Sequence, residues 1–495
     1  MNDGIEARGE EAQKEITRGV SLLIGEPKKA LLKLSGPMIV AMLILAAYNL
    51  VNAVWVAGLG SDALAAVGFV TPIFMVVVGL SNGLGAGVSS SISRRIGAQD
   101  KRGADNTTMH ALLLVLLVSM ILTAVLLLTL EPLLSAMGAG SSLGLAMEYG
   151  NIVFSGSIFM VFTNIAYAIL RGEGDTKRTM YAMGAGSLIN AVLDPILIYW
   201  AGMGIAGAAW GTVISLLIVA MVQIYWLIVK KDTYVSLSRN AFVPSRKVMS
   251  DILKVGIPAS VEFLLYSIDA IIINSMLVRV SGTDAVAVYT AGWRVIMMAT
   301  IPLIAIATAE ISVAGAAIGA RRYGNLPVIH NYSTKLGFAI GTVTALITGI
   351  FAPQITMFFT YTPESAHLAG TMVAFMHVMC LFYPFMSPGI MSACLFQGAG
   401  KGLTSLLLNV LRDVVLITMV AFILGMVLGL GQEGIWWGIV FGNIAGSLLS
   451  YLWARLYISR LMKVKGTAKR IRSPIYMIDH ICQVWSVGQR SVSTL

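Results

Sequence analysis

Twelve long apolar segments run through this chain of 495 residues, and they constrain its fold more than any other feature. Each is long enough to cross the hydrocarbon core of a bilayer as a helix, which takes about 20 residues. Only 12% of the residues are charged, against about 25% in soluble proteins. We therefore predict an all-α polytopic membrane protein with spans at about 31–57, 66–92, 108–130, 149–170, 179–201, 204–229, 250–279, 285–315, 332–355, 369–396, 404–429 and 434–461.

The basic residues are concentrated in alternate connections between these segments. Of the 34 Lys and Arg residues, all but Arg279 and Arg294 lie before the first segment, in every second connection, or in the C-terminal tail. Positively charged connections stay in the cytoplasm, so both termini are expected there and the chain in the plasma membrane. The net charge of +10 has this origin and does not indicate nucleic-acid binding.

The polar stretch 230–249 divides the chain into two similar halves. We predict a cytoplasmic N-terminal tail (1–30), an N-lobe of helices 1–6 (31–229), this cytoplasmic connection, a C-lobe of helices 7–12 (250–461) and a basic cytoplasmic tail (462–495). The triplet Ile96-Gly97-Ala98 recurs as Ile318-Gly319-Ala320. Six spans per half is an even number, so a pseudo-two-fold axis along the membrane normal relates the two bundles, as in alternating-access carriers.

An ionisable residue interrupts the fifth apolar segment. Asp194 follows Asn190 by four residues, so the two side chains lie on one face of a helix. Pro195 lacks an N–H and leaves the carbonyl of Ala191 unpaired. Carboxylate, amide and carbonyl oxygens suit a small cation or a proton, and intramembrane carboxylates usually mark such paths. The alternative is an aspartate that pairs with a neighbouring helix.

Several motifs resemble those of multidrug and toxic compound extrusion (MATE) transporters, in particular their prokaryotic branch. They are Tyr48-Asn49-Leu50-Val51-Asn52, Ile92-Ser93-Arg94-Arg95-Ile96-Gly97-Ala98, Leu170-Arg171-Gly172-Glu173-Gly174-Asp175, Asn190 to Pro195, and Gly315 to Ala320. The resemblance implies two six-helix bundles in a V shape. It also implies export of organic cations or amphiphiles, driven by inward H⁺ or Na⁺, with no other cofactor. We expect a monomer.

The resemblance also implies roles for individual residues. Asp194 matches the cation-binding carboxylate of the family, Asn190 its amide partner and Thr212 a nearby hydroxyl. Cavity-lining positions are matched by Tyr48, Tyr149 and Asn164, and the helix-1 proline associated with bending is matched by Pro37. The family's helix-1 carboxylate is replaced by Asn52, so we expect a one-carboxylate site in the N-lobe or a contribution from the other lobe.

The C-lobe has ionisable residues of its own. Glu262 and Asp269 are seven residues apart and lie roughly on one helix face, so they could form a second cation site. Alternatively, Asp269 pairs with Arg294. Glu310 is expected either in a site or in a salt bridge with Arg321 or Arg322, and His377 either as a proton acceptor or as an ordinary hydrogen-bonding group.

Other functions remain as alternatives. A flippase for lipid precursors or polysaccharides would favour a basic central cavity, yet Lys and Arg are nearly absent from the spans. A channel or receptor without coupling is a further alternative. No Walker loop, Gly-x-Ser-x-Gly motif or Cys/His metal spacing is present in the sequence, so we do not expect an enzyme, and transport must depend on an ion gradient. H⁺ and Na⁺ both fit the residues.

Overall fold

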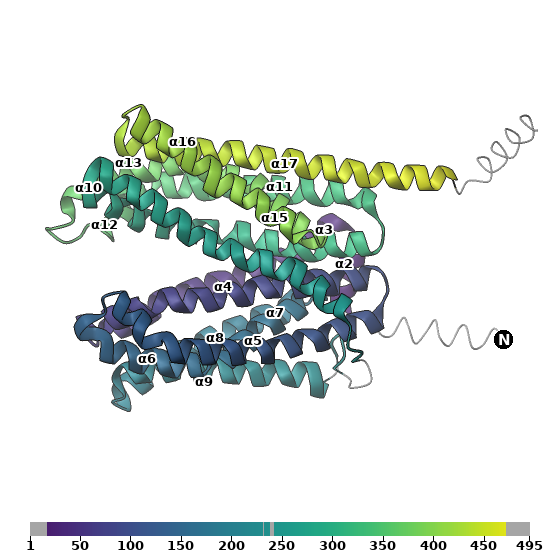
Figure 1. Cartoon of the computed structure of the whole chain (residues 1–495), viewed down its shortest axis with the longest axis horizontal. Coiled ribbons are helices and arrows are strands. Elements are labelled where there is room, and N and C mark those ends of the chain that lie inside the picture. The colour runs from purple at the N-terminus through teal and green to yellow at the C-terminus, as the bar shows by residue number, and fades with distance from the viewer. Residues whose placement is uncertain (1–16, 231, 238–241, 472–495) are drawn as a thin grey trace, which may run out of the picture.

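The computed structural model describes residues 17–230, 232–237 and 242–471, and this part of the chain is helical throughout its spans. Figure 1 shows two layers of lengthwise helices, α4–α9 in one and α10–α17 in the other, with α2 and the end of α17 at the same end of the molecule. The helices are α2 (Arg18–Ile24), α3 (Pro27–Ala57), α4 (Ser61–Gly97), α5 (Lys101–Ala136), α6 (Leu143–Ser155), α7 (Ser157–Gly172), α8 (Thr176–Pro195), α9 (Gly204–Ile224), α10 (Arg246–Gly319), α11 (Leu326–Ile350), α12 (Ala352–Met357), α13 (Ala369–Met379), α14 (Phe382–Gly398), α15 (Gly402–Asn409), α16 (Thr418–Phe422) and α17 (Gly431–Ile471).

Four short π-helical stretches interrupt or extend these helices. They are η2 (Ile196–Trp200), η3 (Tyr225–Lys230), η7 (Val410–Ile417) and η8 (Ile423–Val427). In a π-helix the hydrogen bonds skip one extra residue, and such turns are frequent at functional sites. The first of them follows Pro195 directly, and η7 carries a buried ion pair described below.

The twelve predicted spans are confirmed, although their boundaries differ. Nine described helices are long and apolar enough to cross a membrane, and each of the bent pairs α6–α7 and α13–α14 forms a further span. The 74 residues of α10 would extend about 110 Å as one helix, far more than a bilayer core. Its backbone leaves the helical conformation at Gly282 (φ 74°), so spans seven and eight meet there.

At one end of the molecule, the first helix of each lobe packs against the other lobe. Val248 and Ile252, at the start of α10, lie in the hydrophobic core of the N-lobe. Leu31 and Leu34, near the start of α3, pack with Leu326 and other residues of the C-lobe. The predicted tail 1–30 also contains α2 and the first turn of α3. The division at 230–249 thus separates the two lobes along the chain. In space, however, the start of α3 packs against the C-lobe and the start of α10 packs against the N-lobe.

Small residues bring α4 and α10 into contact at the same end. We define the lobe junction as Ser89, Ser93 and Gly97 of α4 with Ser312, Gly315 and Gly319 of α10. The Ser89 and Ser312 hydroxyls are 3.0 Å apart. A Cβ at Gly97 would overlap the Ala316 carbonyl oxygen, and one at Gly319 would overlap the Arg94 carbonyl oxygen. The two repeat-related glycines therefore make equivalent contacts, as small residues do where membrane helices approach closely.

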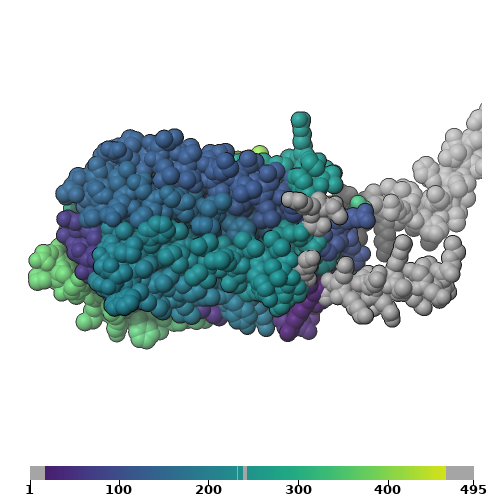
Figure 2. All heavy atoms as spheres, turned by 90° about the horizontal axis from the view of Figure 1, so that it is seen from below, coloured from purple at the N-terminus to yellow at the C-terminus, as the bar shows by residue number. Residues whose placement is uncertain are grey.

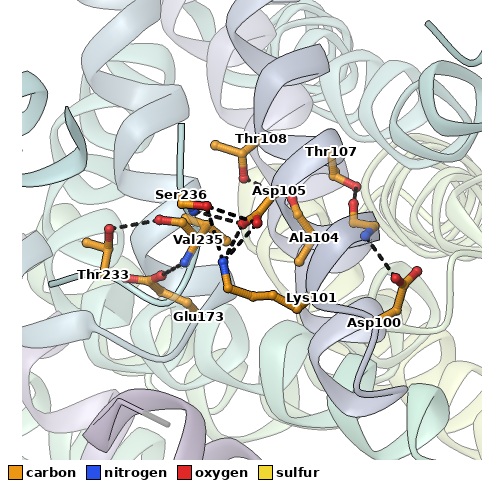
Figure 3. A network of polar contacts seen from close by, with 11 residues as sticks. Asp100, Lys101, Ala104, Asp105, Thr107, Thr108, Glu173, Thr233, Val235 and Ser236 are labelled. Atoms are coloured by element: carbon orange, nitrogen blue, oxygen red, sulfur yellow. Dashed lines mark hydrogen bonds and ion pairs between the residues drawn. The ribbon is translucent and has the colours of Figure 1, made fainter. Parts of the chain in front are cut away.

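The connection between the lobes is attached to the N-lobe. Figure 2, which views the lower bundle of Figure 1 from below, shows the residues coloured blue and teal covering this face. In Figure 3 the Asp105 carboxylate accepts hydrogen bonds from the Ser236 N–H (2.8 Å) and hydroxyl (2.9 Å), and Lys101 forms an ion pair with it (2.7 Å). Glu173, which caps α7, accepts from the Val235 N–H (3.1 Å).

The environment of Glu173 leads to a prediction about pH. Burial raises the pKa of this carboxyl to about 8, and the Val235 N–H opposes that rise. The folded state therefore binds a proton that the unfolded chain releases above about pH 4.5, so this contribution to stability is present at low pH and is lost as the pH rises towards 8. Between about pH 5 and pH 8, we expect the melting temperature in detergent to fall less for Glu173→Gln than for the wild type. A wild-type melting temperature that rises over this interval would contradict the assignment.

Candidate functional site

Asp194 occupies a buried position at the end of α8, one residue before its terminal proline. The side chain is 0% exposed, and neither carboxylate oxygen accepts a hydrogen bond from any described residue. Gly211 of α9 faces it so closely that a Cβ there would overlap Oδ1. The glycine therefore lets α9 approach the carboxylate, which lies where Pro195 and η2 end the regular α-helix.

The other residues predicted for the N-lobe site surround this carboxylate. Asn190, 2% exposed, donates to the Ser215 hydroxyl (3.1 Å), while its own carbonyl oxygen receives no hydrogen bond from the described residues. Tyr48 of α3 and Tyr149 of α6 lie close enough to interact electrostatically with Asp194, and both interact with the Thr212 hydroxyl of α9. Four elements thus bring oxygen atoms to one place.

Two of the predicted residues take more peripheral positions. Asn52 donates its amide hydrogen to the Tyr48 hydroxyl (2.8 Å), one helical turn away, which leaves the Tyr48 proton available to another acceptor. Asn164 of α7 donates to the Met160 carbonyl (2.9 Å), and no described hydrogen bond joins it to Asp194. Pro37 lies inside α3, which continues through it without a break.

The C-lobe contains a second cluster of ionisable side chains. Glu262 accepts hydrogen bonds from Ser405 (2.8 Å) and Gln397 (3.1 Å). Asp269 is 8% exposed and faces the Thr418 hydroxyl at 3.5 Å. Unlike Asp194, both carboxylates therefore have polar partners within their own lobe.

Sequence reasoning missed the cation of this cluster. Arg412 is buried on η7 and forms two hydrogen bonds to the adjacent Asp413, at 2.7 and 2.9 Å. It also interacts with the charges of Glu262 and Asp269. The prediction that every Lys and Arg except Arg279 and Arg294 lies in a connection or a tail is therefore wrong for Arg412. An adjacent Arg and Asp inside the apolar segment 404–429 was the signal that could have revealed it.

Two of the predicted ion pairs are not formed. Arg294 is exposed, and no described ion pair joins it to Asp269. Glu310 is fully buried and pairs with His330 (3.2 Å) and the Ser333 hydroxyl (2.7 Å), whereas Arg322 donates to the Ile24 carbonyl (2.7 Å). The Nε2 atom of His377 lies 3.1 Å from the Gly349 carbonyl oxygen.

Within the part of the chain that the structure describes, no three His, Cys, Asp or Glu side chains gather as a metal site. Cys380 and Cys394 are free thiols, and Cys482 lies outside the described residues. Two six-span bundles with a buried carboxylate between the helices of one bundle define a membrane transport protein rather than a soluble binding protein.

Comparison with known proteins identifies the family. The family model MatE matches residues 37–196 and 258–428, more than half of the chain. The chain belongs to the MATE family.

Relatives and solved structures agree with this assignment. The chain is 25% identical to the multidrug export protein MepA of Staphylococcus saprophyticus, over 88% of this chain and 94% of that protein. It is 26% identical to the FAD transporter of Shewanella oneidensis, over 79% and 87% of the two chains. A solved MOP superfamily transporter from Pyrococcus furiosus is 41% identical and superposes with a TM-score of 0.88, covering 90% of this chain and 99% of that one. MATE transporters have twelve membrane-spanning helices in two bundles, and the described part of this chain has the same arrangement.

Proposed function

We propose that this transporter is a secondary active multidrug exporter that exchanges organic cations or amphiphiles for H⁺ or Na⁺. It would act in the plasma membrane with both termini in the cytoplasm, as the distribution of Lys and Arg predicts. The coupling ion would bind at Asp194, supported by Asn190, Thr212 and the two tyrosines.

The observation that carries this proposal is the unpartnered carboxylate of Asp194. A buried charge without a partner is costly, so the group must take up a proton or a cation when water cannot reach it. Na⁺ prefers oxygen ligands, and the carbonyl oxygen of Asn190 receives no hydrogen bond from the described residues. Both ions therefore find suitable chemistry at this site.

The charge of the lobes favours a cationic substrate. Asp194, Glu262, Asp269 and Asp413 lie within the spans, and Arg412 interacts with the last three of them. An excess of negative charge attracts cations. FAD is an anion, so the relative named as an FAD transporter shows that the relatives alone do not determine the substrate. The excess of negative charge is the reason for proposing a cationic one.

Efflux of ethidium from proteoliposomes tests the proposal. The vesicles carry a pH gradient in one experiment, a Na⁺ gradient in a second, and neither in a third. We expect accelerated efflux under at least one gradient and none without a gradient. Equal rates in all three experiments would identify an uncoupled channel, and the absence of counterflow would support that conclusion.

Asn52 offers a prediction about the one-carboxylate site. Asn52→Asp places a second carboxylate one turn from Tyr48, and two neighbouring carboxylates share a proton more readily than one. If H⁺ is the coupling ion, we expect the pH at which efflux falls to half to rise by about one unit. Asn164→Asp, on α7, is the control and should leave this pH unchanged. An unchanged profile for Asn52→Asp would show that position 52 is not coupled to Asp194.

A further inference from the structure

The short helix α2 bridges the two lobes next to the lobe junction. On one side, Gly19 packs so closely against the backbone of Glu173 and Gly174 that a Cβ would lie 2.8 Å from it, and Val20 enters the N-lobe core. On the other side, Leu23 enters the C-lobe core. The Ile24 carbonyl accepts a hydrogen bond from Arg322 (2.7 Å). A ligand that holds α2 in place would therefore act on both lobes at once.

The outer face of α2 and the start of α3 form a basic hollow. Its volume is about 350 Å³, and its lining includes Arg18, Lys29 and Lys33, with Ser21 between them and Glu26 as the one acid. Within the described residues none of the three cations forms an ion pair. Arg and Lys side chains grouped around one hollow are the groups that bind phosphate in proteins.

The position of this hollow relative to the bilayer indicates which kind of molecule carries the phosphate. Helix α3 has 31 residues and is about 46 Å long, whereas the hydrocarbon core of a bilayer measures about 30 Å. The charged residues of α3 all lie in its first turns, where Lys29 and Lys33 share one face, so this end of the helix is the one that extends into the headgroup layer. Basic pockets at that depth bind anionic headgroups.

We propose that Arg18, Lys29 and Lys33 bind the phosphate of an anionic phospholipid, and that the bound lipid stabilises α2 in its position between the lobes. This function is separate from ion coupling, because the hollow lies outside the spans that carry Asp194. The ligand would be a structural lipid of the leaflet that this end of the molecule faces.

Native mass spectrometry of the full chain in detergent tests the proposal. Phosphatidylglycerol, phosphatidylcholine and inorganic phosphate are titrated in separate experiments. The variant is Arg18→Gln with Lys29→Gln and Lys33→Gln. The matched control is Arg246→Gln with Lys247→Gln and Lys254→Gln, which removes three exposed cations from the start of α10.

We expect phosphatidylglycerol to bind wild type and control alike, and to bind the variant about fivefold more weakly for each cation removed. It should also raise the melting temperature of the wild type and the control but not of the variant. Equal binding of phosphatidylcholine, or an unchanged affinity in the variant, would overturn the proposal. Saturable binding of inorganic phosphate that displaces the lipid would assign the site to a free anion instead. Because all three cations are exposed, the variant should fold, and its melting curve without lipid checks this.

Discussion

Replacing Asp194 with asparagine should abolish gradient-driven export while leaving the transporter folded. The substitution keeps the shape of the side chain but removes the charge that binds H⁺ or Na⁺. Because neither oxygen of Asp194 accepts a hydrogen bond from a described residue, no protein contact is lost. With one proton exchanged per substrate, each unit of pH gradient sustains about a tenfold concentration ratio of dye, and the variant should sustain none. The measurement is ethidium accumulation in inverted vesicles.

Asp269→Asn is the matched control for this prediction. Asp269 is also a buried aspartate inside a span, but it has the Thr418 hydroxyl as a partner and Arg412 close by. We expect this variant to keep most of the gradient-driven accumulation. If Asp269→Asn fails and Asp194→Asn succeeds, the coupling site lies in the C-lobe.

A larger side chain at the lobe junction should have a comparably large effect. We expect Gly97→Leu and Gly319→Leu to prevent α4 and α10 from closing, because each new side chain would overlap a backbone carbonyl of the facing helix. Overpacking usually costs about 1–3 kcal/mol, which shifts an equilibrium between two arrangements by about 5- to 150-fold. Export should fall for both variants alike, since the two glycines occupy equivalent positions in the repeat.

Accessibility of the lobe junction to a soluble reagent distinguishes this effect from simple misfolding. A cysteine at Ser89, in a chain without its native cysteines, should react slowly with a charged maleimide because the position is buried at the junction. Gly97→Leu should speed this reaction. Gly68→Leu is the control on the same helix, where a Cβ meets nothing within 4 Å, and it should change neither labelling nor export. Equal labelling in all three proteins would show that the junction does not open.

The fold could be predicted largely from the sequence because hydropathy, charge and repetition act on long stretches of chain. Apolar length predicted the spans, and the recurrence of Ile96-Gly97-Ala98 predicted two related halves. The junction between Gly97 and Gly319 gives that recurrence a physical reason, since both copies pack at one interface. Backbone breaks were harder to predict. The break at Gly282 falls in the gap between the predicted spans 250–279 and 285–315, but the bends between α6 and α7 and between α13 and α14 lie inside the predicted spans 149–170 and 369–396 and were not predicted.

The candidate site was predicted only in part, and the limits are physical. Asp194 and Asn190 share a helix, so their spacing in the sequence already placed them together. The pairing of Glu310 with His330 depends on how α10 packs against α11, and no local sequence pattern predicts this packing. Arg412 was misplaced because a charge near the end of a span can either face water or fold back into the bundle, and only the surrounding helices decide.

The release of ions when substrate binds tests most directly whether Asp194 holds the coupling ion. Detergent-solubilised transporter in weakly buffered solution is titrated with ethidium, while a pH indicator follows H⁺ and a Na⁺-selective electrode follows Na⁺. If Asp194 holds the coupling ion and exchanges it for substrate, the wild type should release about one H⁺ or Na⁺ per dye bound, and Asp194→Asn should bind dye without releasing either. Equal release from both proteins would contradict the account.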